Sequence, residues 1–585
     1  MSSRFDRFVS PDAPIPAQTW AWNMYGAGVA GMGRDGKPEL LPVPEPNDDQ
    51  LLVRVDAVGM CFSDVKLIKQ GGEHPKLYHR DLKTNPTRLG HEATLTVMKV
   101  GKNLQGQYHV GQRLALQPDI YDRDGRSTAY GYTIPGGLIQ YHVIGAEVLS
   151  AGTDGQTSYV IPVEGELGYA AAALTEPWAC VEGAYTQRRR LDPLKGGTLW
   201  IVGHTADTTS YGFSKGLDAP ATIVLTDVPA NVKSLIELEA TKRNVTVIER
   251  NGLSVADYAQ LRDLTKGAGF DDIVVLDPRS AVAISEAAKL IARRGTFNMV
   301  GQHPLDGLVQ TDVGRLHYDY TAYLGNRGPD IATSYGEAHN RADLQPNGVA
   351  VFVGAGGPMG QMHVQRAIEL SNGPHRIIAT DLNAERLATL GVMFNSLAEA
   401  NGKELILINP AESTESLRDF VLRHTDGRGA DDVVVSVPVA SVMAEAATLM
   451  NPDGMLVFFA GVPNGTLAPL DMNLIYLHNA QYTGTSGSRV SDQELVINKA
   501  LAHQLSPNRS VAAIGGLEAA TDGMEAMMAG RYAGKIVIFP QLSNLPLIGL
   551  AELKDKYPDI AAALGPGDVW TAEAERRLIE KFWTI

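Results

Sequence analysis

The sequence predicts an α/β protein in which a β-rich lobe precedes two tandem, doubly wound parallel sheets. Three observations support this fold class. Short apolar stretches separated by glycine and proline turns continue to about residue 150. Buried strand patterns then alternate with helical lengths, and one segment of this second part recurs 160 residues later. Strands that alternate with helices indicate parallel sheets covered on both faces.

The β-rich lobe contains the most informative residues of the chain. Its first long strand is predicted at 51–58, where alternation of apolar and polar residues indicates a half-buried strand. Gly-Met-Cys-Phe-Ser-Asp follows at 59–64, and Arg-Leu-Gly-His-Glu stands at 88–92. One thiol, one imidazole and one carboxylate thus lie in a short stretch, and this is the mixed ligand set of a catalytic zinc.

Residues around this ligand set strengthen the interpretation. Ser63 offers a hydroxyl for proton transfer, and Asp64 offers a carboxylate that can support a ligand. Farther along, Thr-Glu-Pro-Trp-Ala-Cys at 175–180 places Glu176 before a proline, where a helix is expected to start. Cys61 or His91 taken alone is compatible with an ordinary packed residue, but three converging segments indicate one metal site.

The combination of G-x-C-x-S-D, G-H-E and E-P-W-A-C resembles the zinc-dependent medium-chain dehydrogenases, nearest to the polyol and threonine dehydrogenases and the sugar-phosphate reductases. The resemblance implies a GroES-like catalytic domain and a small alcohol or ketone substrate. It implies Cys61, His91 and Glu176 as zinc ligands and Glu92 as an alternating or additional ligand. Ser63 would contact the substrate hydroxyl, and Glu176 would balance the zinc charge.

Two segments depart from the pattern of this family. Relatives often hold a second, structural zinc with four cysteines, but residues 119–137 contain no cysteine, so we expect one catalytic zinc and no structural zinc. Lys66 stands where relatives commonly have a histidine that passes the proton to solvent, and a lysine does this only if its pKa is lowered. Lys66, His74 and Arg88 are candidate contacts for a substrate phosphate or hydroxyl.

The first parallel sheet is predicted from strands at 197–203, 221–227, 244–249 and 271–277. Gly203 ends the first of these strands, but the second and third glycines of a G-x-G-x-x-G motif are absent. Asp207 occupies the place where a backbone would approach a pyrophosphate, and its carboxylate would repel that group. We therefore expect the first sheet to have lost cofactor binding.

The second sheet begins with a buried strand and a glycine-rich turn at 348–360. Asp381 ends the next strand, 21 residues after the last glycine of that turn. Strand, glycines, helix, strand and acid in this order are typical of a Rossmann-type dinucleotide site. An acid at this position favours NAD over NADP because it repels a 2′-phosphate. The predicted cofactor-binding residues are Gly354, Gly356, Gly357, Gly360 and Asp381.

The two sheets are predicted to be copies of one fold. Residues 267–278 and 427–438 are identical at seven of twelve positions, and a period of 160 residues is the size of a domain. Because an exposed edge strand invites pairing, we expect 319–326 and 479–486 to join edge to edge in one continuous sheet. Such pairing would make either an intrachain pseudo-dimer of the two sheets or a homo-oligomer.

The expected domains are a GroES-like zinc-binding domain at 1–175, a first Rossmann-like domain with a degenerate glycine motif at 176–340, a second, NAD-binding Rossmann domain at 341–515, and a C-terminal return with a helical extension at 516–585.

Composition narrows the function classes. With 44% hydrophobic and 20% charged residues, the 585-residue chain is typical of a globular protein. A net charge of −15 argues against nucleic acid or an anionic membrane as partner. Two distant cysteines, no signal peptide and no apolar run of membrane-spanning length lead us to expect a cytoplasmic protein.

The sequence therefore predicts a zinc-dependent oxidoreductase that transfers a hydride between NAD(H) and a secondary alcohol or ketone of a polyol, sugar or sugar phosphate. A metal-free reductase of the quinone type is an alternative, but it needs no cysteine, histidine and glutamate set. The second alternative is a non-catalytic binding protein that responds to NAD. It is considered because the first nucleotide fold has a degenerate glycine motif.

Overall fold

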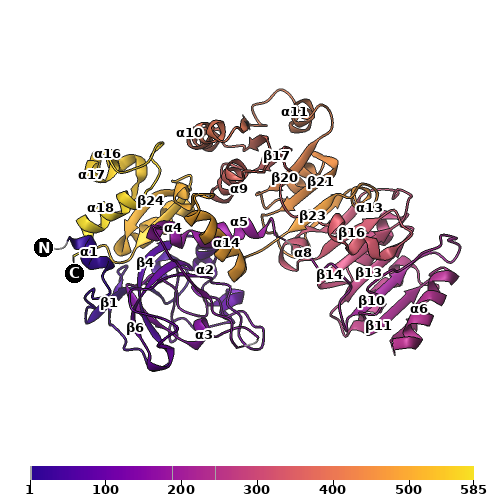
Figure 1. The fold of residues 1–585 in the computed structure, drawn as a ribbon, viewed down its shortest axis with the longest axis horizontal. Helices are drawn as coiled ribbons and strands as arrows, with labels where there is room; N and C mark the ends of the chain where they lie inside the picture. Colours follow the sequence, from indigo (N-terminus) through magenta and orange to yellow (C-terminus); the bar gives the residue numbers. More distant parts are fainter. Residues whose placement is uncertain (1–2, 154, 187–188, 244, 585) are drawn as a thin grey trace. The chain divides into compact units, whose positions relative to one another are not determined.

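A computed structural model describes residues 3–153, 155–186, 189–243 and 245–584 (Figure 1). The chain divides into two compact units, and each contains separated parts of the sequence. Unit 1 consists of Met1–Gly183, Gly357–Met362 and Gly487–Ile585, and unit 2 of Ala184–Gly356 and His363–Ser486. Residues 487–515, which were expected in the second Rossmann domain, therefore belong to unit 1.

Unit 1 is built on one eight-stranded sheet. Its order is β26-β24-β25-β4-β6-β7-β9, and β8 also pairs with β4. The strands are β4 (Leu51–Gly59), β6 (Glu92–Val100), β7 (Arg113–Leu116), β8 (Tyr141–Ile144), β9 (Val160–Pro162), β24 (Val511–Gly516), β25 (Lys535–Phe539) and β26 (Ile548–Gly549). β25 pairs antiparallel with β4, so the C-terminal part of the chain returns to the β-rich lobe.

The expectation of a half-buried strand at 51–58 was wrong, because all nine residues of β4 are buried. Two charged side chains inside this strand neutralise each other: Arg54 Nε lies 2.6 Å from Asp56 Oδ1. Arg54 also donates to the carbonyl of Phe8, and its guanidinium stacks on the Phe8 ring at 3.6 Å. The alternation of polar residues thus reflects an internal ion pair and not a solvent-exposed face.

Helices of unit 1 cover this sheet and tie the two ends of the chain together. The helices used below are α1 (Arg4–Val9), α2 (Phe62–Gln70), α4 (Tyr169–Ala173), α5 (Thr175–Gly183), α14 (Val490–Leu501), α15 (Ala520–Met528), α16 (Leu553–Lys556), α17 (Pro558–Ala561) and α18 (Ala572–Phe582). Glu580 of α18 accepts hydrogen bonds from the backbone N–H groups of Arg4 and Phe5 in α1. The extension after residue 541 is therefore a packed part of unit 1.

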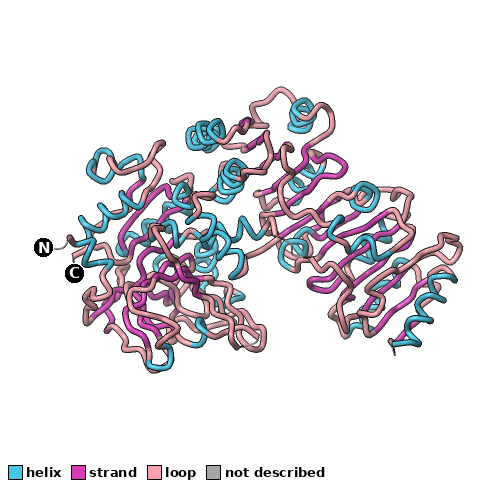
Figure 2. Tube along the Cα trace, in the orientation of Figure 1, coloured by secondary structure: helices cyan, strands magenta, loops and turns pink. Residues whose placement is uncertain are grey.

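Unit 2 contains two parallel sheets, as the sequence predicted (Figure 2). Each sheet has six strands, and the strand order is the same in both. The first runs β12-β11-β10-β13-β14-β16 and the second β19-β18-β17-β20-β21-β23. The first sheet consists of β10 (Thr198–Val202), β11 (Thr222–Thr226), β12 (Thr246–Glu249), β13 (Phe270–Leu276), β14 (Ile291–Val300) and β16 (Ala322–Asn326). The second consists of β17 (Val349–Val353), β18 (Arg376–Thr380), β19 (Glu404–Ile408), β20 (Ala430–Val435), β21 (Met450–Phe458) and β23 (Gln481–Gly484).

The connections also correspond, with one exception. The first fold has α6 (Ala230–Arg243), η5 (Val255–Thr265), α7 (Ala281–Ala288) and α8 (Val313–Tyr318), and the second has α10 (Ala384–Ala400), α11 (Leu417–His424), α12 (Ala440–Ala447) and α13 (Asn473–His478) at the same places. In the second fold α9 (Pro358–Glu369) also joins β17 to β18. The equivalent segment 203–221 of the first fold contains turns and bends and no helix.

The two folds meet through a small additional sheet. β15 (Val309–Asp312) of the first fold pairs antiparallel with β22 (Leu467–Leu470) of the second. The apolar core is continuous between them, since side chains such as Phe297 and Leu316 belong to the same buried cluster as Tyr476 and Tyr482. The predicted continuous sheet does not form, because β16 and β23 remain the outer strands of two separate sheets.

Candidate active site

The thiol, imidazole and carboxylate of the sequence motifs come together at the ends of two neighbouring strands. Cys61 follows β4 and stands at the N-cap of α2, while His91 and Glu92 lie at the start of β6. β4 and β6 are antiparallel partners, and Gly59 is paired with Glu92. As a result, ligand atoms of Cys61, His91 and Glu92 all lie within 4.8 Å of one another.

Asp64 supports two of these three residues. Its Oδ2 accepts a hydrogen bond from the backbone N–H of Cys61 at 3.0 Å, and its Oδ1 lies 3.2 Å from Nδ1 of His91. Burial disfavours the imidazolium, but the Asp64 carboxylate outweighs burial and holds the pKa of His91 well above its usual value. With Nδ1 engaged by a carboxylate, Nε2 is the nitrogen directed to a metal. The predicted supporting role of Asp64 matches this geometry.

Glu92 is fully buried and has two differently placed oxygens. Oε1 accepts from the ammonium group of Lys535, a buried residue of β25. Oε2 is buried and has no hydrogen-bond partner in the described part of the chain. Gly59 is required beside it, since a Cβ there would lie 2.1 Å from Oε2. A buried carboxylate oxygen without a partner is costly, and a cation bound by sulfur, nitrogen and oxygen would relieve that cost. The donor set therefore fits zinc.

Glu176 was expected as a zinc ligand but is not one of the three clustered residues. It lies in the first turn of α5, is 6% exposed, and interacts electrostatically with His91 and Glu92. Burial, aided by the negative charges of Glu92 and Asp119, raises the pKa of Glu176 to about 8. Cys180 Sγ lies 4.0 Å from its Oε1. Glu176 thus borders the cluster from a different segment.

Ser63 lies next to the ligand set, as expected. Its Oγ is 3.2 Å from Nε2 of His91. Lys66, the residue at the position of the missing histidine, is exposed on α2. Tyr132 was missed by the sequence analysis; its ring centroid lies 5.9 Å from that of His91, and it hydrogen bonds with Ser63. Lys535 was missed as well, because no sequence signal connects residues separated by 443 positions.

The predicted cofactor residues lie where the second fold's first strand turns into α9. Gly354 has a φ of +78°, which favours glycine. The backbone N–H of Gly356 donates to Oδ2 of Asp381 at 2.9 Å. Around Gly357 a Cβ would meet nothing within 4 Å, so this backbone is open to a ligand. Gly360 is buried within α9. A glycine turn at the N-terminus of a 12-residue helix is suited to a pyrophosphate.

The corresponding place in the first fold has a pocket lined by Gly203 and His204 but lacks the glycine turn and the helix. Without a helix after Gly203, no ring of helical N–H groups faces a ligand there. Asp207 accepts hydrogen bonds from the backbone N–H of Thr209 at 2.8 Å and from the Tyr211 hydroxyl at 2.7 Å. These hydrogen bonds outweigh partial burial and lower the pKa of Asp207, so its charge persists. The ring of Tyr211 packs into the core of this fold.

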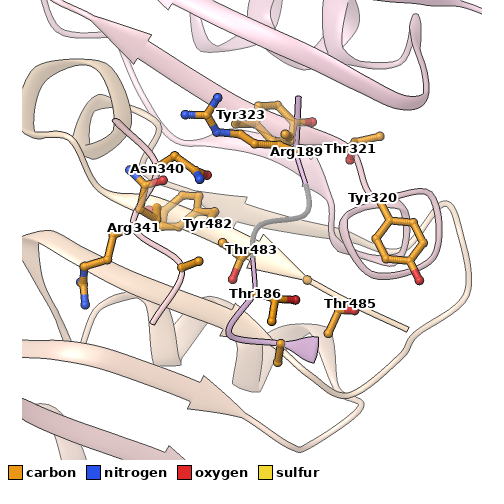
Figure 3. A pocket seen from close by; sticks show the side chains of 15 residues that line it. Thr186, Arg189, Tyr320, Thr321, Tyr323, Asn340, Arg341, Tyr482, Thr483 and Thr485 are labelled. Carbon is orange, nitrogen blue, oxygen red and sulfur yellow. The ribbon is translucent and has the colours of Figure 1, made fainter. Parts of the chain in front are cut away.

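A pocket of about 50 Å³ lies in unit 2, where β16 and β23 approach each other (Figure 3). None of the predicted site residues lines it. Tyr320, Tyr323 and Tyr482 come from the two strand edges, and Arg189 and Arg341 come from connecting segments. The hydroxyl of Thr485 is buried there without a hydrogen-bond partner among the described residues. The two sheets stay separate on either side of this pocket.

No other cluster of three metal-binding side chains occurs in the part of the chain that the structure describes. Among those residues, no helix combines the length and the hydropathy needed to cross a bilayer.

Comparisons with known proteins agree with the motifs. Residues 47–153 match the family model "Alcohol dehydrogenase GroES-like domain", and residues 358–502 match "Zinc-binding dehydrogenase". The chain is 31% identical over 315 residues to the uncharacterized protein YggP of Escherichia coli, covering 50% of this chain and 72% of that protein. It is 22% identical over 547 residues to the mannitol-1-phosphate 5-dehydrogenase of Aliivibrio fischeri, covering 92% and 93%.

A solved structure gives the same fold. An oxidoreductase/dehydrogenase of unknown specificity from Escherichia coli superposes with a TM-score of 0.50 at 14% identity, covering 89% of this chain and 99% of that one. At this identity the likeness concerns the fold alone.

Proposed function

The chain belongs to the zinc-dependent medium-chain dehydrogenase family, and from this premise we propose that it transfers a hydride between NAD(H) and a secondary alcohol or ketone of a polyol, a sugar or a sugar phosphate. One observation carries the proposal: Cys61, His91 and Glu92 present sulfur, nitrogen and an unpartnered buried oxygen to one point. Three protein donors with an open position are the pattern of catalytic zinc. The relative that acts on mannitol 1-phosphate supports the substrate class.

The residues around the metal site have separate tasks in this proposal. A bound zinc would supply Lewis-acid polarisation of the substrate oxygen. Ser63, beside His91, would relay the substrate hydroxyl proton toward solvent during oxidation and back during reduction, passing on its own proton as it takes up the other. Asp64 keeps His91 in the orientation that a ligand needs. Lys535 neutralises Glu92, and Glu176, from a separate helix, would exchange with Glu92 as a further ligand.

We assign NAD to the second fold. The open backbone at Gly357 and the N-terminus of α9 would receive the pyrophosphate, and Asp381 would receive the ribose hydroxyls. The first fold would then act as an internal partner. Its β15 pairs with β22, the strand at the same place in the copy, as two subunits do across a two-fold axis. One NAD per chain in isothermal titration is the expected result; two per chain would refute a silent first fold.

Metal analysis and kinetics test the proposal together. Purified protein should contain one zinc per chain by mass spectrometry and should reduce NAD with members of a panel of polyols and sugar phosphates. Cys61→Ser should lose the zinc and the activity, because a hydroxyl is a weak zinc ligand compared with a thiolate. Cys180→Ser is the matched control for metal content, since it changes the other cysteine and leaves the three clustered residues in place.

Other results of these measurements would favour the alternative functions. Full activity in protein with no metal would favour the quinone-type reductase. Tight NAD binding without turnover of any alcohol or ketone would favour a non-catalytic binding protein. A zinc content near two per chain would contradict the expectation of one catalytic site.

A further inference from the structure

A histidine and a lysine lie one aromatic ring away from the metal ligands. His74 is the N-cap of the turn η3 (Pro75–Leu77) and Lys76 lies within it, and Tyr132 packs between this turn and His91. The Tyr132 ring centroid lies 5.3 Å from that of His74 and 5.9 Å from that of His91. Lys76 Nζ lies 4.8 Å from the same ring. Tyr132 therefore lies between the metal-ligand cluster and the side chains of His74 and Lys76.

A hydrogen bond to the backbone determines which ring nitrogen of His74 can donate to a ligand. Nδ1 of His74 accepts from the backbone N–H of Lys76 at 3.2 Å. In a neutral imidazole the proton then resides on Nε2, which is free to donate. Burial and the positive charges of Lys76 and Lys66 lower the pKa of His74.

Lys76 keeps donor capacity for a ligand. Its ammonium lies 3.2 Å from Oδ1 of Asp119, and its side chain is 37% exposed. An ammonium has three N–H donors, and Asp119 accepts one of them. Burial lowers the pKa of Lys76, but Asp119 together with Tyr132 and Tyr121 raises it by more, so the charge of Lys76 persists.

We propose that Lys76 and His74, on the other side of Tyr132 from His91, bind a phosphate monoester, with Lys66 adding positive potential, so that the substrate is a phosphorylated polyol or ketose. The proposal rests on the function proposed above. A compact ammonium and a neutral imidazole donor suit a dianion with three acceptor oxygens. In a linear sugar phosphate, several carbon atoms separate the reacting hydroxyl from the phosphate, as Tyr132 separates His91 from Lys76.

Pairs of substrates that differ only in the phosphate test the proposal. We expect kcat/KM for D-mannitol 1-phosphate and L-sorbose 1-phosphate to exceed that for D-mannitol and L-sorbose by on the order of 100-fold, the effect of one or two charge-assisted hydrogen bonds. Inorganic phosphate should inhibit competitively. Equal kcat/KM values within a pair would overturn the phosphate site while leaving the dehydrogenase function intact.

Variants of Lys76 test whether this residue causes the preference for phosphorylated substrates. Lys76→Met should lower kcat/KM by on the order of 10- to 100-fold for the phosphorylated substrates, mainly through KM, and leave the unphosphorylated ones nearly unchanged. Lys76→Met/Asp119→Asn separates the lost cation from the freed carboxylate and should show the same selectivity. Lys69→Met, on the same exposed side of α2 as Lys66 but not acting on His74, is the control.

Three results contradict the site. A Lys76→Met enzyme that loses both members of a substrate pair equally would show a structural role for Lys76. Inhibition by inorganic phosphate that persists unchanged in Lys76→Met would place the anion elsewhere. If no polyol or sugar phosphate reacts with zinc-loaded protein and NAD, the proposed function itself fails.

Discussion

The two folds of unit 2 share one strand order and differ in the segment that follows the first strand. In the second fold, a glycine turn and α9 join β17 to β18; in the first, residues 203–221 join β10 to β11 without a helix. Both keep a pair of aspartates at the start of the fourth strand: Asp272 binds Arg190, and Asp432 binds Arg341. The two copies therefore share the sheet architecture and the aspartate–arginine pairs, and they differ in the turn that would bind a ligand.

This comparison teaches that cofactor binding and sheet architecture are separable. The sheet depends on buried strands and on the aspartate clamps, which are the same in both copies. The site depends on one turn, in which backbone N–H groups must remain open to the pyrophosphate and no carboxylate may point at that group.

The largest expected effect comes from making the second fold resemble the first. Gly356→Asp places a Cβ 2.8 Å from Oδ2 of Asp381 and adds a second carboxylate to the turn. Since like charges placed together cost several kcal/mol, NAD affinity should fall by more than about 100-fold in isothermal titration. Asp207→Asn in the first fold is the matched variant and should leave NAD affinity unchanged. NAD binding that survives Gly356→Asp would mean that the first fold binds the cofactor.

A smaller effect should follow from disturbing the contact between the two copies. A Cβ on Gly325 in β16 would lie 2.4 Å from Cβ of Tyr476 in α13. Gly325→Val should therefore lower the free energy of unfolding of the whole chain by about 2–3 kcal/mol, as overpacking does. Gly212→Ala, in open space, should change it by less than about 0.5 kcal/mol in the same urea titration. Unfolding of only one fold in Gly325→Val would show that the copies are not coupled.

The smallest expected effect concerns the choice of cofactor. Asp381 is held by the N–H groups of Gly356 and Asn383, so its carboxylate is fixed at the end of β18. Asp381→Ser removes the negative charge that would face a 2′-phosphate and should relax the preference for NAD over NADP by about 10-fold. The ratio of kcat/KM for the two cofactors measures this. Equal use of NADP by the unmodified protein would contradict the assignment.

Local patterns in the sequence were enough to predict several parts of the molecule. The motifs around Cys61, Asp64, His91 and Glu92 predicted that a thiol, an imidazole and carboxylates lie close together, whereas the predicted ligand Glu176 lies outside the three clustered residues. The glycine turn and Asp381 predicted the form of the second fold, and the repeat at 267–278 and 427–438 predicted its duplication. These features depend on residues that are close in the chain or recur at a fixed period, so their geometry follows from strand and helix rules.

Other features of the molecule were decided by the tertiary structure alone. They depend on charges and side chains that folding brings together from distant segments. Lys535 meets Glu92 across 443 residues, and Glu575 caps the N-terminus of α4 across 406. The Arg54–Asp56 pair can be buried only because Phe8 covers it, so alternation in the sequence suggested an exposed face that does not exist. The packing of the two copies, and not the sequence pattern of either one, determines two further features. These are the pairing of β15 with β22 and the pocket between β16 and β23.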